Sequence, residues 1–290
     1  MNEEILRINN EVFIHLLETQ NFKSNIVSAF LLTDLKKETA TMNALIPSVL
    51  KRGTNECKTM KDIAIKMEEM YGAIFDVSID KQGDQQVVEL YISTIDSKFS
   101  LKGEDLLKES LKFIYDVMYN PYIENGMFSK AYVDQEKEAL KEQIKSKIND
   151  KAVYATNRCI EEMFKKSSYS IYKYGREEDL ENINEENLFN AYKDLLGSSE
   201  KHFYIAGNFD KEEVVSFFKE KFEVKDVENS KIIRTRKDNI LISEVIKVTE
   251  NMDVTQGKLV LGYDVGVELT PENLYKVLTF NAILRFICKF

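Results

Sequence analysis

Histidine and cysteine are scarce in this 290-residue chain, and each scarcity excludes a class of site. The two histidines, His15 and His202, are far apart in the sequence, so no helix carries a pair of them at the i, i+4 spacing of a zinc motif. Each falls within a strand pattern and is expected to be a sheet side chain. The three cysteines, Cys57, Cys159 and Cys288, form no CxxC pair, so neither a thiolate metal site nor a disulfide framework is predicted.

Positive charge is also in the minority, because 49 acidic residues outnumber 40 basic ones and the net charge is −9. This excess repels phosphate backbones and anionic lipids, so nucleic acid and membranes are not expected partners. Cationic peptides would be attracted, but an acidic pI of this kind usually means only solubility, and we favour that interpretation. The N-terminal sequence MNEEILRINNEVFIHLLE has acidic residues where a signal peptide has basic ones, and no apolar run approaches membrane-spanning length. We therefore predict a cytoplasmic protein.

Hydrophobic periodicity predicts strands and helices in blocks. Strands are expected over residues 11–18, 25–33 and 201–209, and a hairpin is expected from 73–80 and 85–93, with Gly83 in its turn. Helical spacing covers residues 40–50, 59–71, 104–120, 128–166, 184–196 and 210–222. Blocks of this kind, rather than strict alternation, favour an α+β fold in which an antiparallel-rich sheet packs against helices.

A weak internal repeat predicts a second unit near the C-terminus. Residues 257–284 repeat the order strand, polar loop, helix that residues 24–50 show, with few identities. Residues 223–238 are polar and aperiodic, as a linker would be. We therefore expect a first domain over 1–222, a linker over 223–238, and over 239–290 the start of a similar domain that the chain does not complete.

Four segments carry a resemblance to a known family. They are LKRGTNECKTMKDIAIKMEEMYGAIFDVSID, PYIENGMFSKAYVDQEKEALKEQI, SYSIYKYGREEDLENINEENLFNAYKDLL and FYIAGNFDKEEVVSFF. In order and spacing they resemble the first domain of the pitrilysin, insulysin and mitochondrial processing peptidase family of inverzincins, and most closely its inactive YmfF-like branch. The resemblance covers nearly the whole chain. It implies two similar α+β domains in tandem, which agrees with the internal repeat.

The resemblance also implies that the catalytic centre is degenerate. Active members carry HxxEH just before a KGT segment, which corresponds here to 52–54, and its three functional positions fall on Ala44, Pro47 and Ser48. The third zinc ligand of active members, seven residues after the position of Glu136, falls on Gln143. A methyl group, a proline ring, a neutral hydroxyl and a carboxamide supply neither good zinc ligands nor a general base. We therefore expect no metal, no cofactor and no catalysis.

In this family, inert subunits pair with an HxxEH-bearing sister and help to enclose the peptide, so a zinc-bearing peptidase subunit and a peptide substrate are the expected partners. Family peptides dock by adding a strand to a sheet edge. The matching strand covers 73–79, with Phe75, Asp76, Val77 and Ser78 as candidate peptide-binding residues. An internal strand that only fills the core is an equally good interpretation of the same residues.

Two other functions stay open at this stage. The first is a stand-alone binding or accessory protein, since the YmfF-like branch carries the label elongation factor P aminopentanol modification-associated. The second is a residual zinc peptidase, whose turnover a chelator would abolish.

Overall fold

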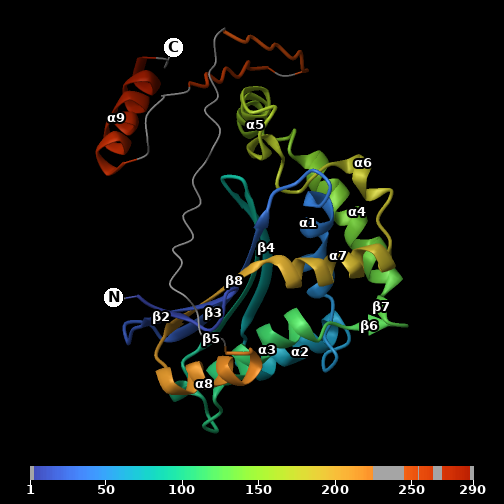
Figure 1. Cartoon of the computed structure of the whole chain (residues 1–290), viewed down its shortest axis with the longest axis vertical. Helices are drawn as coiled ribbons and strands as arrows, with labels where there is room; N and C mark the ends of the chain where they lie inside the picture. Colours follow the sequence, from blue (N-terminus) through green and yellow to red (C-terminus); the bar gives the residue numbers. More distant parts are fainter. Residues whose placement is uncertain (1–2, 225–244, 254, 264–269, 288–290) are drawn as a thin grey trace.

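The structure, a computed structural model, describes residues 3–224, 245–253, 255–263 and 270–287. Its centre is a six-stranded sheet with the strand order β1-β2-β8-β3-β5-β4 (Figure 1). Among the described strands, only β2 and β8 pair in parallel, and the other neighbouring pairs of this sheet are antiparallel. The predicted antiparallel-rich α+β fold is confirmed. The strands are β1 Glu4–Arg7, β2 Val12–Glu18, β3 Ser24–Asp34, β4 Ile74–Gln82, β5 Gln85–Ile95 and β8 Glu200–Gly207.

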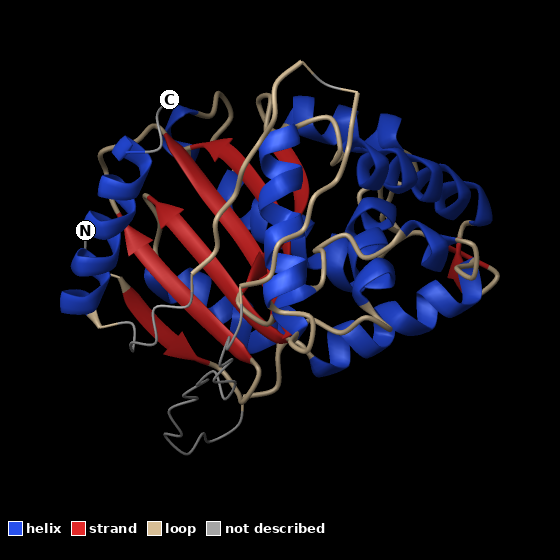
Figure 2. Ribbon diagram, turned by 90° about the horizontal axis from the view of Figure 1, so that it is seen from above, coloured by secondary structure: helices blue, strands red, loops and turns tan. Residues whose placement is uncertain are grey.

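Helices pack on the sheet and form one hydrophobic core with it. Alternate side chains of β3 and β5, among them Val27 and Leu90, are buried together with Leu45 of the first helix and Ile114 of the third. Figure 2 shows the strands side by side with the helices gathered around them. The helices are α1 Ala40–Leu50, α2 Met60–Glu69, α3 Leu106–Tyr119, α4 Lys130–Ser146, α5 Lys151–Met163, α6 Glu177–Leu180, α7 Glu185–Ser198, α8 Lys211–Lys221 and α9 Pro271–Ile287, and a small ribbon joins β6 Ile123–Glu124 to β7 Met127–Phe128.

Local sequence signals fix several of these boundaries. The hydroxyl of Thr59 accepts a hydrogen bond from the Asp62 amide and the Asp62 carboxylate accepts one from the Thr59 amide, a capping box that starts α2. Asp210 caps α8 in the expected way. Gly83 has a φ of +59° in the two-residue turn that joins β4 to β5, a conformation that glycine adopts at little cost.

Two predictions about element boundaries were wrong. The helix expected over 128–166 is divided into α4 and α5, because the Asp150 carboxylate accepts hydrogen bonds from the Ala152 and Val153 amides and caps a new helix there. Residues 257–263, where the repeat predicted a strand, form none, since no described strand pairs with them to satisfy their backbone groups.

The helix of the expected second unit is present as α9. Figure 1 shows it apart from the sheet, and apolar side chains on it are exposed, among them Tyr275 and Phe280. Most of the predicted linker, from 225 to 238, lies outside the described residues. No helix in the described part of the chain is both long and apolar enough to cross a bilayer.

Candidate functional site

The candidate site lies where α1 packs against α4. Ala44 is 3% exposed and Pro47 is also buried, so both side chains of the first helix are part of the core. Ser48 is half-buried, and Gln143 of α4 is exposed. None of the four carries an imidazole, thiolate or carboxylate, so the side chains at these positions do not fit zinc. Among the described residues, no group of three or more His, Cys, Asp or Glu side chains is arranged to hold a metal ion.

Pro47 lies inside α1 rather than at its end. The helix continues through Leu50, and the Lys51 amide donates to the Pro47 carbonyl at 3.0 Å. A proline nitrogen carries no proton, so the carbonyl four residues earlier, on Asn43, loses its usual helical donor. Pro47 therefore lowers the stability of α1. The resemblance places the general base of active family members at this position.

A carboxylate does lie between the two helices, but an arginine neutralises it. Arg52, which follows α1, forms an ion pair with Glu136 through its Nε and Nη2 atoms. The two side chains are 23% and 13% exposed, so the pair is largely shielded from water. Glu136 is the residue that the resemblance places seven positions before the third ligand, and no local pattern indicates that it pairs with Arg52.

A buried polar network fixes the N-terminal half of α1. The Gln86 side chain of β5 is fully buried and donates to the Ala40 carbonyl at 2.9 Å and the Lys173 carbonyl at 2.7 Å. Its Oε1 accepts a hydrogen bond from Asn43 Nδ2 at 3.2 Å. Since buried polar groups cost free energy unless they are paired, this network ties α1 to the sheet in one position.

The predicted peptide-binding strand is β4, and it lies at the edge of the sheet. It pairs with β5 on one side and with no other described strand. Lys51, at the end of α1, reaches it and places its Nζ 2.7 Å from Asp76 Oδ1. The structure therefore brings α1, which carries three of the predicted catalytic positions, next to the strand that carries Phe75, Asp76, Val77 and Ser78.

The hairpin register shows which backbone groups of β4 face outward. Gln82 and Gln85 close the two-residue turn as a hydrogen-bonded pair, so even-numbered residues of β4 exchange backbone hydrogen bonds with β5. The N–H and C=O groups of Phe75, Val77, Ile79 and Lys81 then point to the open edge. The side chains of Phe75 and Val77 are half-buried against the core, while Ile74, Asp76 and Ser78 are exposed on the opposite face.

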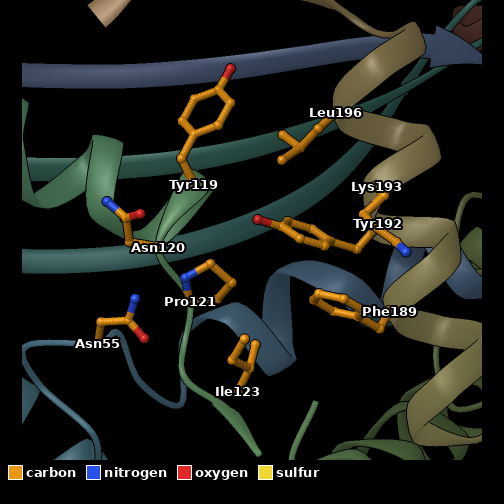
Figure 3. Close-up of a pocket in the computed structure, with 9 residues that line it drawn as sticks. All are labelled: Asn55, Tyr119, Asn120, Pro121, Ile123, Phe189, Tyr192, Lys193 and Leu196. Atoms are coloured by element: carbon orange, nitrogen blue, oxygen red, sulfur yellow. The ribbon is translucent and has the colours of Figure 1, made fainter. Parts of the chain in front are cut away.

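A separate pocket of about 340 Å³ opens where the end of α3 meets α7 (Figure 3). Tyr192 donates to the Met118 carbonyl at 2.7 Å, and Lys193 lies over the Phe189 ring at 5.1 Å. Burial raises the pKa of Tyr119 well above its ordinary value, so this phenol stays protonated. The pocket includes none of the predicted site residues; it is lined by Asn55, Tyr119, Asn120, Pro121, Ile123, Phe189, Tyr192, Lys193 and Leu196.

The two histidines, both predicted to be sheet side chains, lie on β2 and β8 and contact one another. His15 Nε2 is 2.8 Å from His202 Nδ1, and the outer ring nitrogens are each 2.7 Å from a carboxylate, of Glu3 and Glu200 respectively. No local pattern in the sequence indicates this row of four groups, because the parallel pairing of β2 with β8 brings the histidines together.

Comparison with known proteins supports the resemblance found in the sequence. No model of a known protein family matches the chain. The chain is 27% identical over 269 residues to the protein named "Probable inactive metalloprotease YmfF" of Bacillus subtilis (strain 168), a match that covers 93% of the chain and 63% of that relative. The expected similarity to the inactive YmfF-like branch is therefore confirmed, and the chain spans less than two thirds of this relative's length.

Solved structures superpose on the chain and show the same fold. A conserved protein from Enterococcus faecalis V583 superposes with a TM-score of 0.71 at 23% identity, over 76% of this chain and 52% of that one. A peptidase M16 inactive domain from Pseudomonas fluorescens superposes with a TM-score of 0.57 at 12% identity, over 74% of this chain and 49% of its own. These likenesses show the fold, and the chain spans about half the length of each.

Proposed function

We propose that this homologue of an inactive metalloprotease is a cytoplasmic, non-catalytic subunit that binds peptides and pairs with an HxxEH-bearing zinc peptidase. One observation carries the proposal. The open edge of β4 lies beside a helix whose corresponding catalytic positions hold Ala44, Pro47 and Ser48. The chain thus keeps a surface that can bind extended peptides while its side chains do not fit the metal.

The organisation of the second unit belongs to the same proposal. We take residues 1–222 as the peptidase-like domain and 239–290 as the first part of a similar one. The exposed apolar side chains of α9 support this division, because such a helix normally buries its apolar face against other elements.

The proposal is tested by mixing the purified chain with an HxxEH-bearing homologue from the same genome. Light scattering coupled to gel filtration should detect a complex of one copy of each, and a mixed peptide library should be cleaved faster by the pair than by the homologue alone. Chelator-sensitive cleavage by the isolated chain would contradict the proposal and identify a residual peptidase. Peptide binding with no complex would contradict the pairing and leave a stand-alone binding protein.

A further inference from the structure

Two aspartates on β4 occupy part of the edge that a peptide would use. The Oδ1 atom of Asp76 accepts a hydrogen bond from the Val77 amide at 2.8 Å. Four residues later, Asp80 Oδ1 accepts one from the Lys81 amide at the same distance. Val77 and Lys81 belong to the odd-numbered set whose amides face outward, so these donors are already bonded to the strand's own side chains.

A lysine holds each of these carboxylates. Lys51 Nζ lies 2.7 Å from Asp76, and Lys173 Nζ lies 3.4 Å from Asp80. The Lys51 ammonium, with the Val77 amide as a smaller cause, lowers the pKa of Asp76 below its ordinary value, so this carboxylate is charged at neutral pH. Both aspartate side chains are exposed, at 65% and 68%, so each can exchange its present partners for others at small cost.

An added strand would meet these carboxylates directly. The Val77 and Lys81 amides already donate to the Asp76 and Asp80 carboxylates, so a peptide carbonyl can accept from them only if it displaces a carboxylate, whose negative charge also repels it. Side chains of an added strand that lie opposite Asp76 and Asp80 are four residues apart on one face of the peptide. Lysine or arginine at those two places would attract both carboxylates, which then release the amides for the backbone ladder.

We propose that Asp76 and Asp80 form an edge gate that selects extended peptides with cationic side chains at positions i and i+4. This inference rests on the proposed function, since it concerns the same strand edge. Neutral and acidic peptides leave the aspartates on the Val77 and Lys81 amides and bind weakly. The excess negative charge of the whole chain attracts the same class of peptide at longer range.

Three fluorescent nine-residue peptides of alternating threonine and valine test the gate by fluorescence anisotropy. One carries lysine at positions 3 and 7, an isomer carries lysine at positions 3 and 6 on opposite faces, and the third carries none. We expect the 3,7 isomer to bind the unaltered chain about threefold more tightly than the 3,6 isomer, since the 3,6 isomer can place only one lysine opposite an aspartate and one cross-strand ion pair therefore separates them. In Asp76→Ala/Asp80→Ala the two isomers should bind equally, and the lysine-free peptide should bind more tightly than it binds the unaltered chain.

The matched control removes the same charge elsewhere. Glu68→Ala/Glu69→Ala changes two exposed residues of α2 and should keep the preference for the 3,7 isomer. Equal binding of the isomers to the unaltered chain, or a lysine-free peptide that gains nothing from the double substitution, would overturn the gate and leave peptide binding intact. If no peptide binds to either chain, the proposed function itself fails.

Discussion

Arg52 forms an ion pair with Glu136, and this contact joins the end of α1 to α4. The carboxylate is largely buried, so removing its partner leaves a charge with little access to water. Arg52→Met should lower the free energy of unfolding by about 1–3 kcal/mol in urea denaturation. Arg52→Met/Glu136→Gln removes both charges and should recover part of that loss. A double variant no more stable than Arg52→Met would contradict this account.

Introducing the side chains that active members carry tests whether the predicted catalytic positions are correctly identified. A variant with Ala44→His, Pro47→Glu, Ser48→His and Gln143→Glu places two imidazoles and a carboxylate where active members are expected to hold zinc. We expect it to bind one zinc ion per chain in a calorimetric titration, with the unaltered chain as the reference. The same variant without Gln143→Glu should bind more weakly. A folded four-residue variant that binds no zinc would show that these positions do not correspond to the family's ligands.

The sequence predicted what is local and missed what depends on distant partners. Thr59 and Asp62 are three residues apart, so their capping box can be seen in the sequence, and Gly83 marks its turn in the same way. The pairing of His15 with His202, in contrast, depends on the parallel pairing of β2 with β8. No local pattern specifies such a pairing, because strand order follows from the packing of the whole domain.

The same limit applies at the candidate site. Phe75 to Ser78 were predicted as a strand from their alternation, and the structure adds that this strand is an edge. The lysine that holds Asp76 follows a helix 25 residues earlier in the sequence, so only the fold reveals the contact. The contact between Lys51 and Asp76 therefore could not be predicted from local sequence patterns.

Gly53, in the RGT segment after α1, has no room for a side chain. A Cβ atom built there would lie 2.6 Å from the Lys58 carbonyl oxygen, a backbone atom that cannot move aside easily. Gly53→Ala should therefore lower the free energy of unfolding by about 1–3 kcal/mol. Gly197→Ala is the matched control, since nothing lies within 4 Å of its Cβ position and alanine is the better helix former. If both variants unfold at the same urea concentration, the result would contradict the close contact between Gly53 and the Lys58 carbonyl.

The histidine pair should make stability depend on pH. Three hydrogen bonds link Glu3, His15, His202 and Glu200, and the bond between the two rings needs one of the two inner nitrogens without a proton, so the pair cannot be fully protonated and keep all three bonds. Burial lowers the pKa of His15, against the opposing effect of Glu3, and the facing His202 lowers it further. The pKa of His15 is thus lower in the folded state than in the unfolded state. The neutral His15 ring therefore contributes stability above about pH 6.5, and this contribution is lost as the pH falls through the lower pKa of the folded state.

The expected result is a fall in the free energy of unfolding between about pH 7 and 5, measured by urea denaturation at each pH. His15→Gln keeps a hydrogen-bonding side chain but cannot gain the proton, so its decline should be shallower. Other groups also face the histidine pair. Tyr204 stacks on His15, and Phe13 stacks on His202. The Arg7 guanidinium lies over the Phe13 ring. An unchanged slope in His15→Gln would assign the pH dependence to other groups.

A proline at one position of β4 can separate strand addition from other modes of peptide binding. The Val77 amide points to the open edge, so Val77→Pro removes a donor that an added peptide would use without removing a bond to β5. Peptide affinity should fall about tenfold, which corresponds to roughly one backbone hydrogen bond. Val77→Ala trims the same half-buried side chain but keeps the amide, so it should bind peptide as the unaltered chain does. Circular dichroism checks that both variants fold, and equal affinity of the two would exclude addition of a strand along this edge.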